Sequence, residues 1–160
     1  GDLFGQGGGR LRFVEQYQRR TGQSASVSNF NLVGAAQVGK ASLTGMRLLH
    51  RIHPHIPLWP LDPIPKSGPM IVEIYTALAA RAAQIPKGRS KIRDLTTLQQ
   101  ALRHLNSAEI QDFGPITDHQ SDALLSAAWM RQISASGQYW RPKLLTDKIA
   151  TQEGWTFGII

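Results

Sequence analysis

A change in hydrophobic period near the middle of the chain constrains the fold most. The stretches IPLWPLDPI and PMIVEIYTA are short apolar runs that are bounded by prolines and rich in Ile, Val, Trp and Tyr. Each run is too short for a helix. Both favour strands, and the prolines of the first favour an edge or short strand. The second run continues into ALAARAAQI, a strong helix former, so Met70 to Ala83 is predicted as a strand followed by a helix. This half of a β-α-β motif predicts an α/β fold.

Amphipathic helices are predicted on both sides of this unit. Asp94 is a predicted N-cap, and the His53–Pro54 pair is a predicted helix end. The tail EGWTFGII alternates Trp155 and Phe157, which favours a last strand or an extended segment. Residues 1–9 are glycine-rich and are predicted to form a flexible loop. The predicted helices cover residues 10–20, 43–53, 95–105 and 117–130, and the apolar face of the last continues to Ile133.

Length and composition narrow the class of protein. At 160 residues, 41% of them hydrophobic, the chain is expected to form a single domain with a real core over 1–160. It contains neither a run of about eighteen apolar residues nor a basic-then-apolar leader, so a cytoplasmic protein without a membrane span is expected. The lack of cysteine excludes thiolate metal sites, so oxygen or imidazole would have to hold any metal. A net charge of +7 makes nucleic acid a plausible partner.

Two aspartates stand at the start of the predicted helix DHQSDALLSAAWM. Asp118 has the position of an ordinary cap, because the N–H groups and dipole of a helix start favour negative charge. Asp122 lies one turn further in, on the apolar stripe that a helix normally turns toward a core. That stripe consists of Leu125, Ser126, Trp129 and Ile133. A carboxylate on such a face needs a partner, a raised pKa or a metal ion.

Glu73 is the second candidate carboxylate, in the middle of the strand-like run IVEIY. Considered alone, it is interpreted as a solvent-facing side chain, since Val72 and Ile74 face the other way. Considered with Asp122, it suggests two carboxylates brought together at the end of a sheet. Hard oxygen ligands of this kind hold the Mg²⁺ ions of phosphodiesterases, where the metal activates water and stabilises the leaving oxygen.

Two further motifs favour structural interpretations. GAAQVGKAS, residues 34–42, is similar to a phosphate-binding P-loop, but Ala41 stands where that loop needs Ser or Thr. Close helix packing through small residues is the favoured explanation. His50, His53 and His55 are close enough in sequence to suggest zinc, yet they lie at a proline-broken helix end without the i, i+4 spacing of helical metal sites. A solvated helix end is favoured there.

Three motifs, in this order, resemble one family: VEIYTALAARA, DHQSDALLSAAW and EGWTFGII. Over Leu58 to Ile160 the chain resembles the DUF429 family of predicted nucleases with a ribonuclease H-like fold. The phrase from His119 to Ala123 also resembles the H-x-x-D-A signature at the last catalytic helix of RuvC-type resolvases, and Glu73 resembles their middle acidic residue. The resemblance implies Glu73 and Asp122 as ligands of Mg²⁺ or Mn²⁺, with Asp118 or His119 assisting.

The start of the chain departs from that family. Ribonuclease H-like nucleases open with a three-stranded meander whose first strand carries an essential Asp, whereas this chain opens with a glycine-rich loop and a helix. Asp62 is a poor replacement, because only a short proline-rich connection separates it from Glu73. The expected fold is therefore a ribonuclease H-like α/β fold with a small sheet, several packing helices and no N-terminal strands. Either the chain is the C-terminal part of a longer protein, or the family member has lost its first strands and with them its activity.

Three functional interpretations follow. The first is a metal-dependent nuclease that hydrolyses phosphodiesters and is incomplete or inactive as this chain. The second is a non-catalytic basic module that binds nucleic acid or a protein partner and forms a homodimer through the sheet edge left by missing strands. The third is an unrelated α/β domain whose carboxylates only cap helices or face solvent. The candidate nucleic-acid-binding residues are Arg10, Arg12, Arg19 and Arg20.

Overall fold

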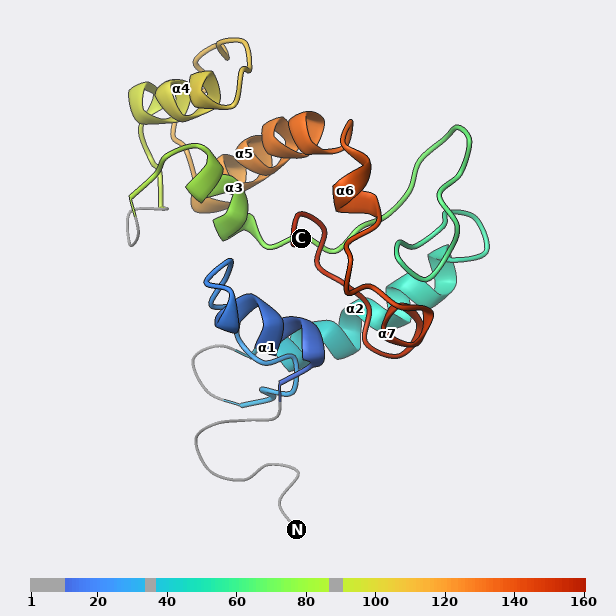
Figure 1. Ribbon diagram of the computed structural model, residues 1–160. Coiled ribbons are helices and arrows are strands. Elements are labelled where there is room, and N and C mark those ends of the chain that lie inside the picture. Colours follow the sequence, from blue (N-terminus) through green and yellow to red (C-terminus); the bar gives the residue numbers. More distant parts are fainter. Residues whose placement is uncertain (1–10, 34–36, 87–90) are drawn as a thin grey trace. The chain divides into compact units, whose positions relative to one another are not determined.

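The computed structural model describes residues 11–33, 37–86 and 91–160 (Figure 1). In these ranges the chain forms seven helices and no β-strand. The predicted amphipathic helices are confirmed, although α2 begins five residues before the predicted start at Leu43, and the two short helices near the C-terminus were not predicted. The helices are α1 (Phe13–Arg20), α2 (Val38–Ile52), α3 (Thr76–Ala82), α4 (Leu95–His104), α5 (Asp118–Ile133), α6 (Gly137–Trp140) and α7 (Asp147–Gln152).

The predicted α/β, ribonuclease H-like sheet is wrong. Among the described residues, strand-like pairing is limited to two isolated parallel bridges, Leu58 with Ile71 and Glu73 with Thr156. Single bridges of this kind bring extended segments together without building a ladder. The segments predicted as strands are therefore close neighbours, and the described part of the chain is helical.

Prolines explain why the first pairing stops. Five prolines lie within 57–69, and each lacks an amide donor and has a fixed φ. Only two hydrogen bonds form around the bridge: the Trp59 amide donates to the Ile71 carbonyl and the Ile71 amide to the Pro57 carbonyl, each at 2.9 Å. Pro57 and Pro69 lack the amide donors that would extend the pairing toward lower residue numbers.

The tail predicted as a last strand is a buried, irregular segment. The Phe157 amide donates to the Glu73 carbonyl at 2.8 Å, but Trp155, Thr156 and Phe157 are all buried. A half-exposed strand would bury only alternate residues. The Trp155 indole N–H donates to the Ile159 carbonyl at 3.0 Å and holds the segment in a turn.

The chain divides into two compact units. Unit 1 comprises the described residues up to Glu73 together with Lys143–Ile159, and unit 2 comprises Ile74–Pro142 with Ile160. The boundary falls within the predicted strand-and-helix segment. Glu73 thus belongs to unit 1, and α3, which follows it closely, belongs to unit 2.

Unit 2 has an apolar core formed by three helices. Helix α5 packs against α3 and α4. Arg131 of α5 strengthens this packing, because its guanidinium donates to the Asn106 carbonyl at 2.6 Å just after α4. The stripe predicted on α5 is confirmed as the buried face. The core side chains of these helices include Leu78, Ala79, Leu98, Ala101, Leu102, Leu125, Ala128, Trp129 and Ile133.

Side-chain caps fix the starts of α4 and α5. The predicted Asp94 cap is confirmed, since its carboxylate accepts the Thr97 amide at 2.8 Å. Helix α5 is capped by Thr117, whose hydroxyl accepts the Gln120 amide at 3.3 Å, while the Gln120 side chain accepts the Thr117 amide at 2.9 Å. Asp118 is therefore the first helical residue of α5, where its charge meets the positive end of the helix dipole.

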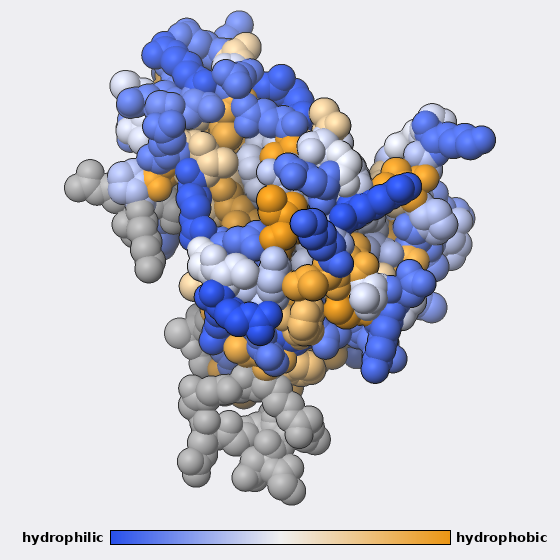
Figure 2. Space-filling view, in the orientation of Figure 1, coloured by the Kyte–Doolittle hydropathy of each residue, from blue (hydrophilic) through white to orange (hydrophobic). Residues whose placement is uncertain are grey.

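Unit 1 combines a small aromatic core with buried polar groups. Trp59 packs edge-on against Phe157 with ring centroids 5.3 Å apart, and Tyr17 lies 6.0 Å from Trp155. On the face drawn in Figure 2, apolar side chains reach the surface between strongly hydrophilic ones. Buried polar side chains in this unit are Glu15, Gln18, Ser24, Ser28 and Thr156.

Helix α2 touches the rest of unit 1 at a close backbone contact. The Gly39 amide donates to the Asn31 carbonyl at 3.0 Å, and a Cβ on Gly39 would lie 2.4 Å from the Asn29 carbonyl oxygen. Ser42, one turn along, hydrogen-bonds to the Asn29 side chain. The predicted packing through small residues is confirmed at Gly39, while residues 34–36 of the P-loop-like motif lie outside the described residues.

Candidate functional site

Glu73, the predicted metal ligand of the middle segment, is an ion-pair partner in unit 1. Its Oε1 accepts the Thr156 hydroxyl at 3.0 Å. Its two oxygens face the Arg12 guanidinium, with Nη2–Oε1 at 3.3 Å and Nη1–Oε2 at 3.5 Å. The Glu73 side chain remains 50% exposed. The guanidinium supplies the positive charge that a metal ion would supply in the predicted site.

Arg12, predicted to bind nucleic acid, is largely enclosed by protein. Its side chain is 14% exposed, and its Nε lies 3.0 Å from Oε1 of the buried Glu15. Its Nη1 also donates to the Glu153 carbonyl at 3.0 Å. Burial alone would lower the pKa of Arg12, but the ion pairs with Glu73 and Glu15 outweigh it and hold that pKa above its ordinary value. The positive charge of Arg12 is therefore balanced by the Glu15 and Glu73 carboxylates of the same chain.

The buried carboxylate of Glu15 organises the surrounding backbone. Its Oε1 accepts the Asn29 amide at 2.9 Å, and its Oε2 accepts the Arg12 amide at 2.9 Å. Farther along α1, the Gln18 side chain donates to the Thr156 hydroxyl at 3.0 Å. These bonds add polar contacts among α1, the loop before α2 and the C-terminal tail to the aromatic contact of Tyr17 with Trp155.

The other three predicted site residues lie on the first turns of α5, in unit 2. Asp118 Oδ1 accepts Arg93 Nε at 3.1 Å, and Lys91 Nζ lies 3.7 Å from Oδ2. The hydrogen bond from Arg93 is the main reason why the pKa of Asp118 lies below its ordinary value. His119 is exposed, and Asp122 is partly exposed at the end of the buried stripe. Asp118 is thus paired with cations, as Glu73 is.

The predicted metal ligands fall in different units. Glu73 belongs to unit 1 and Asp122 to unit 2. In the described part of the chain, no group of three or more His, Asp or Glu side chains is arranged to hold a metal ion. The two ligands implied by the resemblance thus have no third partner among these residues. Binding of Mg²⁺ or Mn²⁺ stays a prediction.

The end of α2 is held by a histidine–aspartate pair. His53 Nε2 lies 2.9 Å from Asp62 Oδ1, and the Leu58 amide donates to Asp62 Oδ2 at 2.7 Å. The Leu58 amide, followed by His53, lowers the pKa of Asp62 below its ordinary value. His50 and His55 are exposed. This arrangement favours the structural interpretation of the three histidines over the zinc interpretation.

The predicted basic surface of α1 is only partly free. Arg10 lies outside the described residues. Arg19 is exposed, and its Nη2 donates to the Ser26 carbonyl at 2.9 Å. The Arg20 guanidinium lies 5.9 Å from the centroid of the Tyr17 ring, in a cation–π contact. Arg19 and Arg20 remain available to an anionic partner, whereas Arg12 is already paired with Glu15 and Glu73.

A second basic surface, on α2, was not predicted. Residues 16–61 contain no Asp or Glu, so this part of the chain carries only positive charge. Lys40, Arg47 and Arg51 are exposed and lie at i, i+7 and i+11, which places them on one stripe of α2. None of the ion pairs found among the described residues involves them. The acid-free run was the sequence signal that could have located this stripe.

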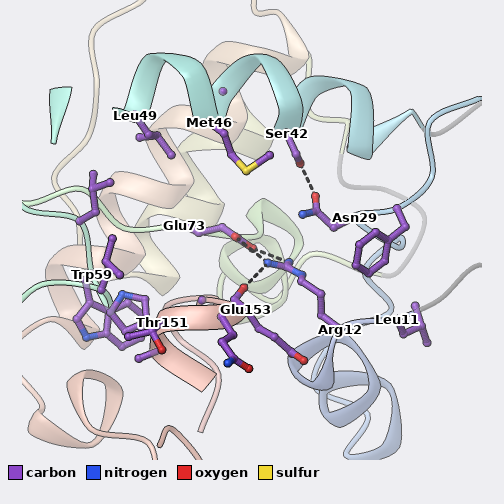
Figure 3. A pocket seen from close by; sticks show the side chains of 18 of the residues that line it. Leu11, Arg12, Asn29, Ser42, Met46, Leu49, Trp59, Glu73, Thr151 and Glu153 are labelled. Carbon is purple, nitrogen blue, oxygen red and sulfur yellow. Dashed lines mark hydrogen bonds and ion pairs between the residues drawn. The ribbon is translucent and has the colours of Figure 1, made fainter. Parts of the chain in front are cut away.

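A groove in unit 1 lies on the other side of α2 (Figure 3). It has a volume of about 920 Å³. Met46 and Leu49 point from α2 toward the groove, and the Arg12–Glu73 pair lies across from them. Trp59 and its neighbours in the 58–61 turn form another part of the wall. The groove is mostly apolar and carries charge at one place.

Comparison of the chain with protein-family models, with curated proteins and with solved structures finds no match. The resemblance to the DUF429 family therefore stays a prediction from the quoted motifs. Among the described residues, no helix combines the length and apolar character needed to cross a bilayer. The geometry described above is thus the basis for a functional proposal.

Proposed function

We propose that the chain is a non-catalytic module that binds the phosphate backbone of nucleic acid through α2. The observation that carries the proposal is the stripe of Lys40, Arg47 and Arg51 within a run that contains no acidic residue. Unpaired cations on one helix face bind phosphates through counterion release, without requiring base contacts.

The dimensions of the stripe suit a nucleic-acid backbone. Lys40 and Arg51 are eleven residues apart, so they are separated by about 16 Å along the helix axis. That length corresponds to about five phosphates of one strand of duplex DNA. Met46 and Leu49 lie on the opposite side of α2, toward the groove. A backbone bound to the stripe would therefore leave the groove open.

The nuclease interpretation receives less support from the same structure. The predicted ligand Asp122 is partly exposed, but the predicted ligand Glu73 and the assisting Asp118 each already face a cation of this chain. A metal ion would have to displace Arg12 or Arg93 from them, at a cost in favourable ion pairing. This competition for Glu73 and Asp118 supports a non-catalytic module over a metal-dependent nuclease, and the proposal includes no metal-dependent step.

The test is the salt dependence of binding to a short labelled DNA duplex, measured by fluorescence anisotropy. Replacing Lys40, Arg47 and Arg51 with Gln should reduce the slope of log K against log salt by about 3, one unit for each lost phosphate contact. The matched control replaces Lys66, Lys143 and Lys148 with Gln. These lysines are also exposed in unit 1, and the change in net charge is the same.

Three outcomes would overturn the proposal. The first is no binding by the parent chain, and the second is an equal loss of slope in both triple variants, which would indicate a general charge effect. The third is Mg²⁺ or Mn²⁺ binding, followed by calorimetry, that both Glu73→Gln and Asp122→Asn abolish. That last result would favour a metal-dependent nuclease site over a non-catalytic module.

A further inference from the structure

The groove beside Met46 and Leu49 of α2 carries negative charge at one place, although the protein as a whole is basic. The carboxylates of Glu15 and Glu73 lie against one guanidinium, that of Arg12, which also donates to the Glu153 backbone carbonyl. Two carboxylates against one cation, with the Glu153 carboxylate close by at the Phe13 amide, leave an excess of negative charge at this place. A ligand that enters the groove therefore meets the opposite sign of charge from one that approaches the outer face of α2.

Among these carboxylates, Glu73 is the one that can meet a ligand. Glu15 is 1% exposed and its oxygens are engaged by Arg12 and by backbone amides. Glu153 accepts the Phe13 amide. Glu73 is 50% exposed, and its contacts to Arg12, at 3.3 and 3.5 Å, are long for charge-assisted hydrogen bonds. Its carboxylate retains capacity for a further donor.

Arg12, by contrast, has little capacity for an anionic ligand. Its Nε donates to Glu15, its Nη1 to Glu73 and the Glu153 carbonyl, and its Nη2 to Glu73. The side chain is also only 14% exposed. An anion in the groove would approach the neighbouring carboxylates without gaining a free guanidinium edge, so it would be repelled.

The walls of the groove select a ligand with an apolar body. Met46 and Phe30 both line the groove and are 54% and 52% exposed, so a bound molecule could remove their apolar surface from water. Leu49 and Trp59 add further apolar surface. The volume of about 920 Å³ lies within the range of about 300–1,000 Å³ that is typical of small-molecule sites.

We infer that this groove binds a small organic cation, an amine with an apolar body, whose ammonium group contacts Glu73 while the body packs between Met46 and Trp59. This site is separate from the nucleic-acid stripe, because the two lie on opposite sides of α2. The ammonium group donates hydrogen bonds to the exposed Glu73 carboxylate and neutralises the excess negative charge around Arg12.

Three probes of equal length test this inference by calorimetry on the full chain: octylamine, octanol and octanoate. Octylamine should bind most tightly and octanoate most weakly, because only the terminal charge differs among them. Glu73→Gln should lower the octylamine affinity about tenfold and leave that of octanol nearly unchanged, since a hydrogen bond to a charged group is lost. Glu109→Gln, at an exposed glutamate of unit 2, is the matched control and should have no effect.

A second variant separates ligand binding from a folding defect, because Glu73 also pairs with Arg12. Met46→Arg changes a half-exposed side chain at the groove, introduces a cation there, and should weaken octylamine binding while the circular dichroism spectrum stays that of the parent. Equal affinity for the three probes, tighter binding of octanoate, or no binding of octylamine would overturn the inference. So would octylamine binding that Met46→Arg leaves unchanged.

Discussion

The two units of this chain bury different kinds of side chain. Of the nineteen apolar residues buried in the described part of the chain, fourteen belong to unit 2 and five to unit 1. Of the twelve large apolar residues that are exposed there, ten belong to unit 1. Unit 2 is held mainly by apolar burial, whereas unit 1 combines a small aromatic core with buried polar contacts and keeps apolar surface in contact with water.

This difference bears on the binding surfaces proposed above. A surface that stays apolar in a folded unit is a candidate interaction site, because such exposure is unfavourable unless a partner covers it. In unit 1 this surface includes Phe30, Leu43 and Met46, on and beside α2. Unit 2 offers no comparable group among its described residues. Both binding surfaces proposed above, the outer stripe of α2 and the groove, therefore lie in the unit that keeps this apolar exposure.

The largest expected effect tests the apolar core of unit 2. Leu98 is fully buried on α4, so Leu98→Ala should lower the free energy of unfolding by about 4 kcal/mol through lost burial and a cavity. Leu48→Ala on α2 removes the same atoms from a side chain that is 58% exposed, and it should change stability by less than about 0.5 kcal/mol. Urea unfolding followed by circular dichroism measures both, and equal losses would contradict the contrast between the units.

The second prediction tests the polar cluster of unit 1. Arg12→Met should destabilise this unit by about 3 kcal/mol, because it leaves the buried Glu15 carboxylate without its cation. Native-state hydrogen exchange should show faster exchange of the Asn29 amide, which donates to Glu15. Arg93→Met breaks the exposed pair with Asp118 and is the control, with little change expected. Similar effects of the two substitutions would mean that the burial of Glu15 does not depend on Arg12.

Helices were predictable here because their signals are local. The Asp94 cap and the apolar spacing that follows it located α4, and the stripe from Leu125 to Ile133 gave the buried face of α5. Each of these features depends on residues within a few turns of one another. The Thr117 cap was missed because two adjacent residues, Thr117 and Asp118, both suit a helix start.

The sheet was predicted wrongly because strand pairing depends on distant residues. The apolar runs around Trp59 and Ile71 do meet, but the prolines between them stop the pairing after one bridge. The pairing of Arg12 with Glu73, sixty-one positions apart, is not written in either local pattern. Arg12 was predicted to bind nucleic acid and Glu73 to bind a metal ion. Their contact with each other could not be predicted from their spacing in the sequence.

The smallest expected effect concerns the contact between α2 and the loop that precedes it. Two glycines of α2, one at this contact and one away from it, provide a matched pair. Gly39→Ala would place a Cβ 2.4 Å from the Asn29 carbonyl oxygen and 3.0 Å from that of Asn31, both backbone atoms that cannot rotate away. The loop must shift, and we expect a loss of about 2 kcal/mol. Gly45→Ala meets nothing within 4 Å and should stabilise the helix by about 0.5–1 kcal/mol.

Both substitutions gain the same helix propensity, so the difference between their unfolding free energies isolates the contact at Gly39. Urea unfolding gives this difference, and faster hydrogen exchange at the Gly39 amide should accompany the loss, because that amide donates to Asn31. If Gly39→Ala stabilised the chain as much as Gly45→Ala, α2 would not pack closely against the preceding loop. The groove behind it would then lose its α2 wall, whereas the outer stripe of Lys40, Arg47 and Arg51, which needs only the helix itself, would persist.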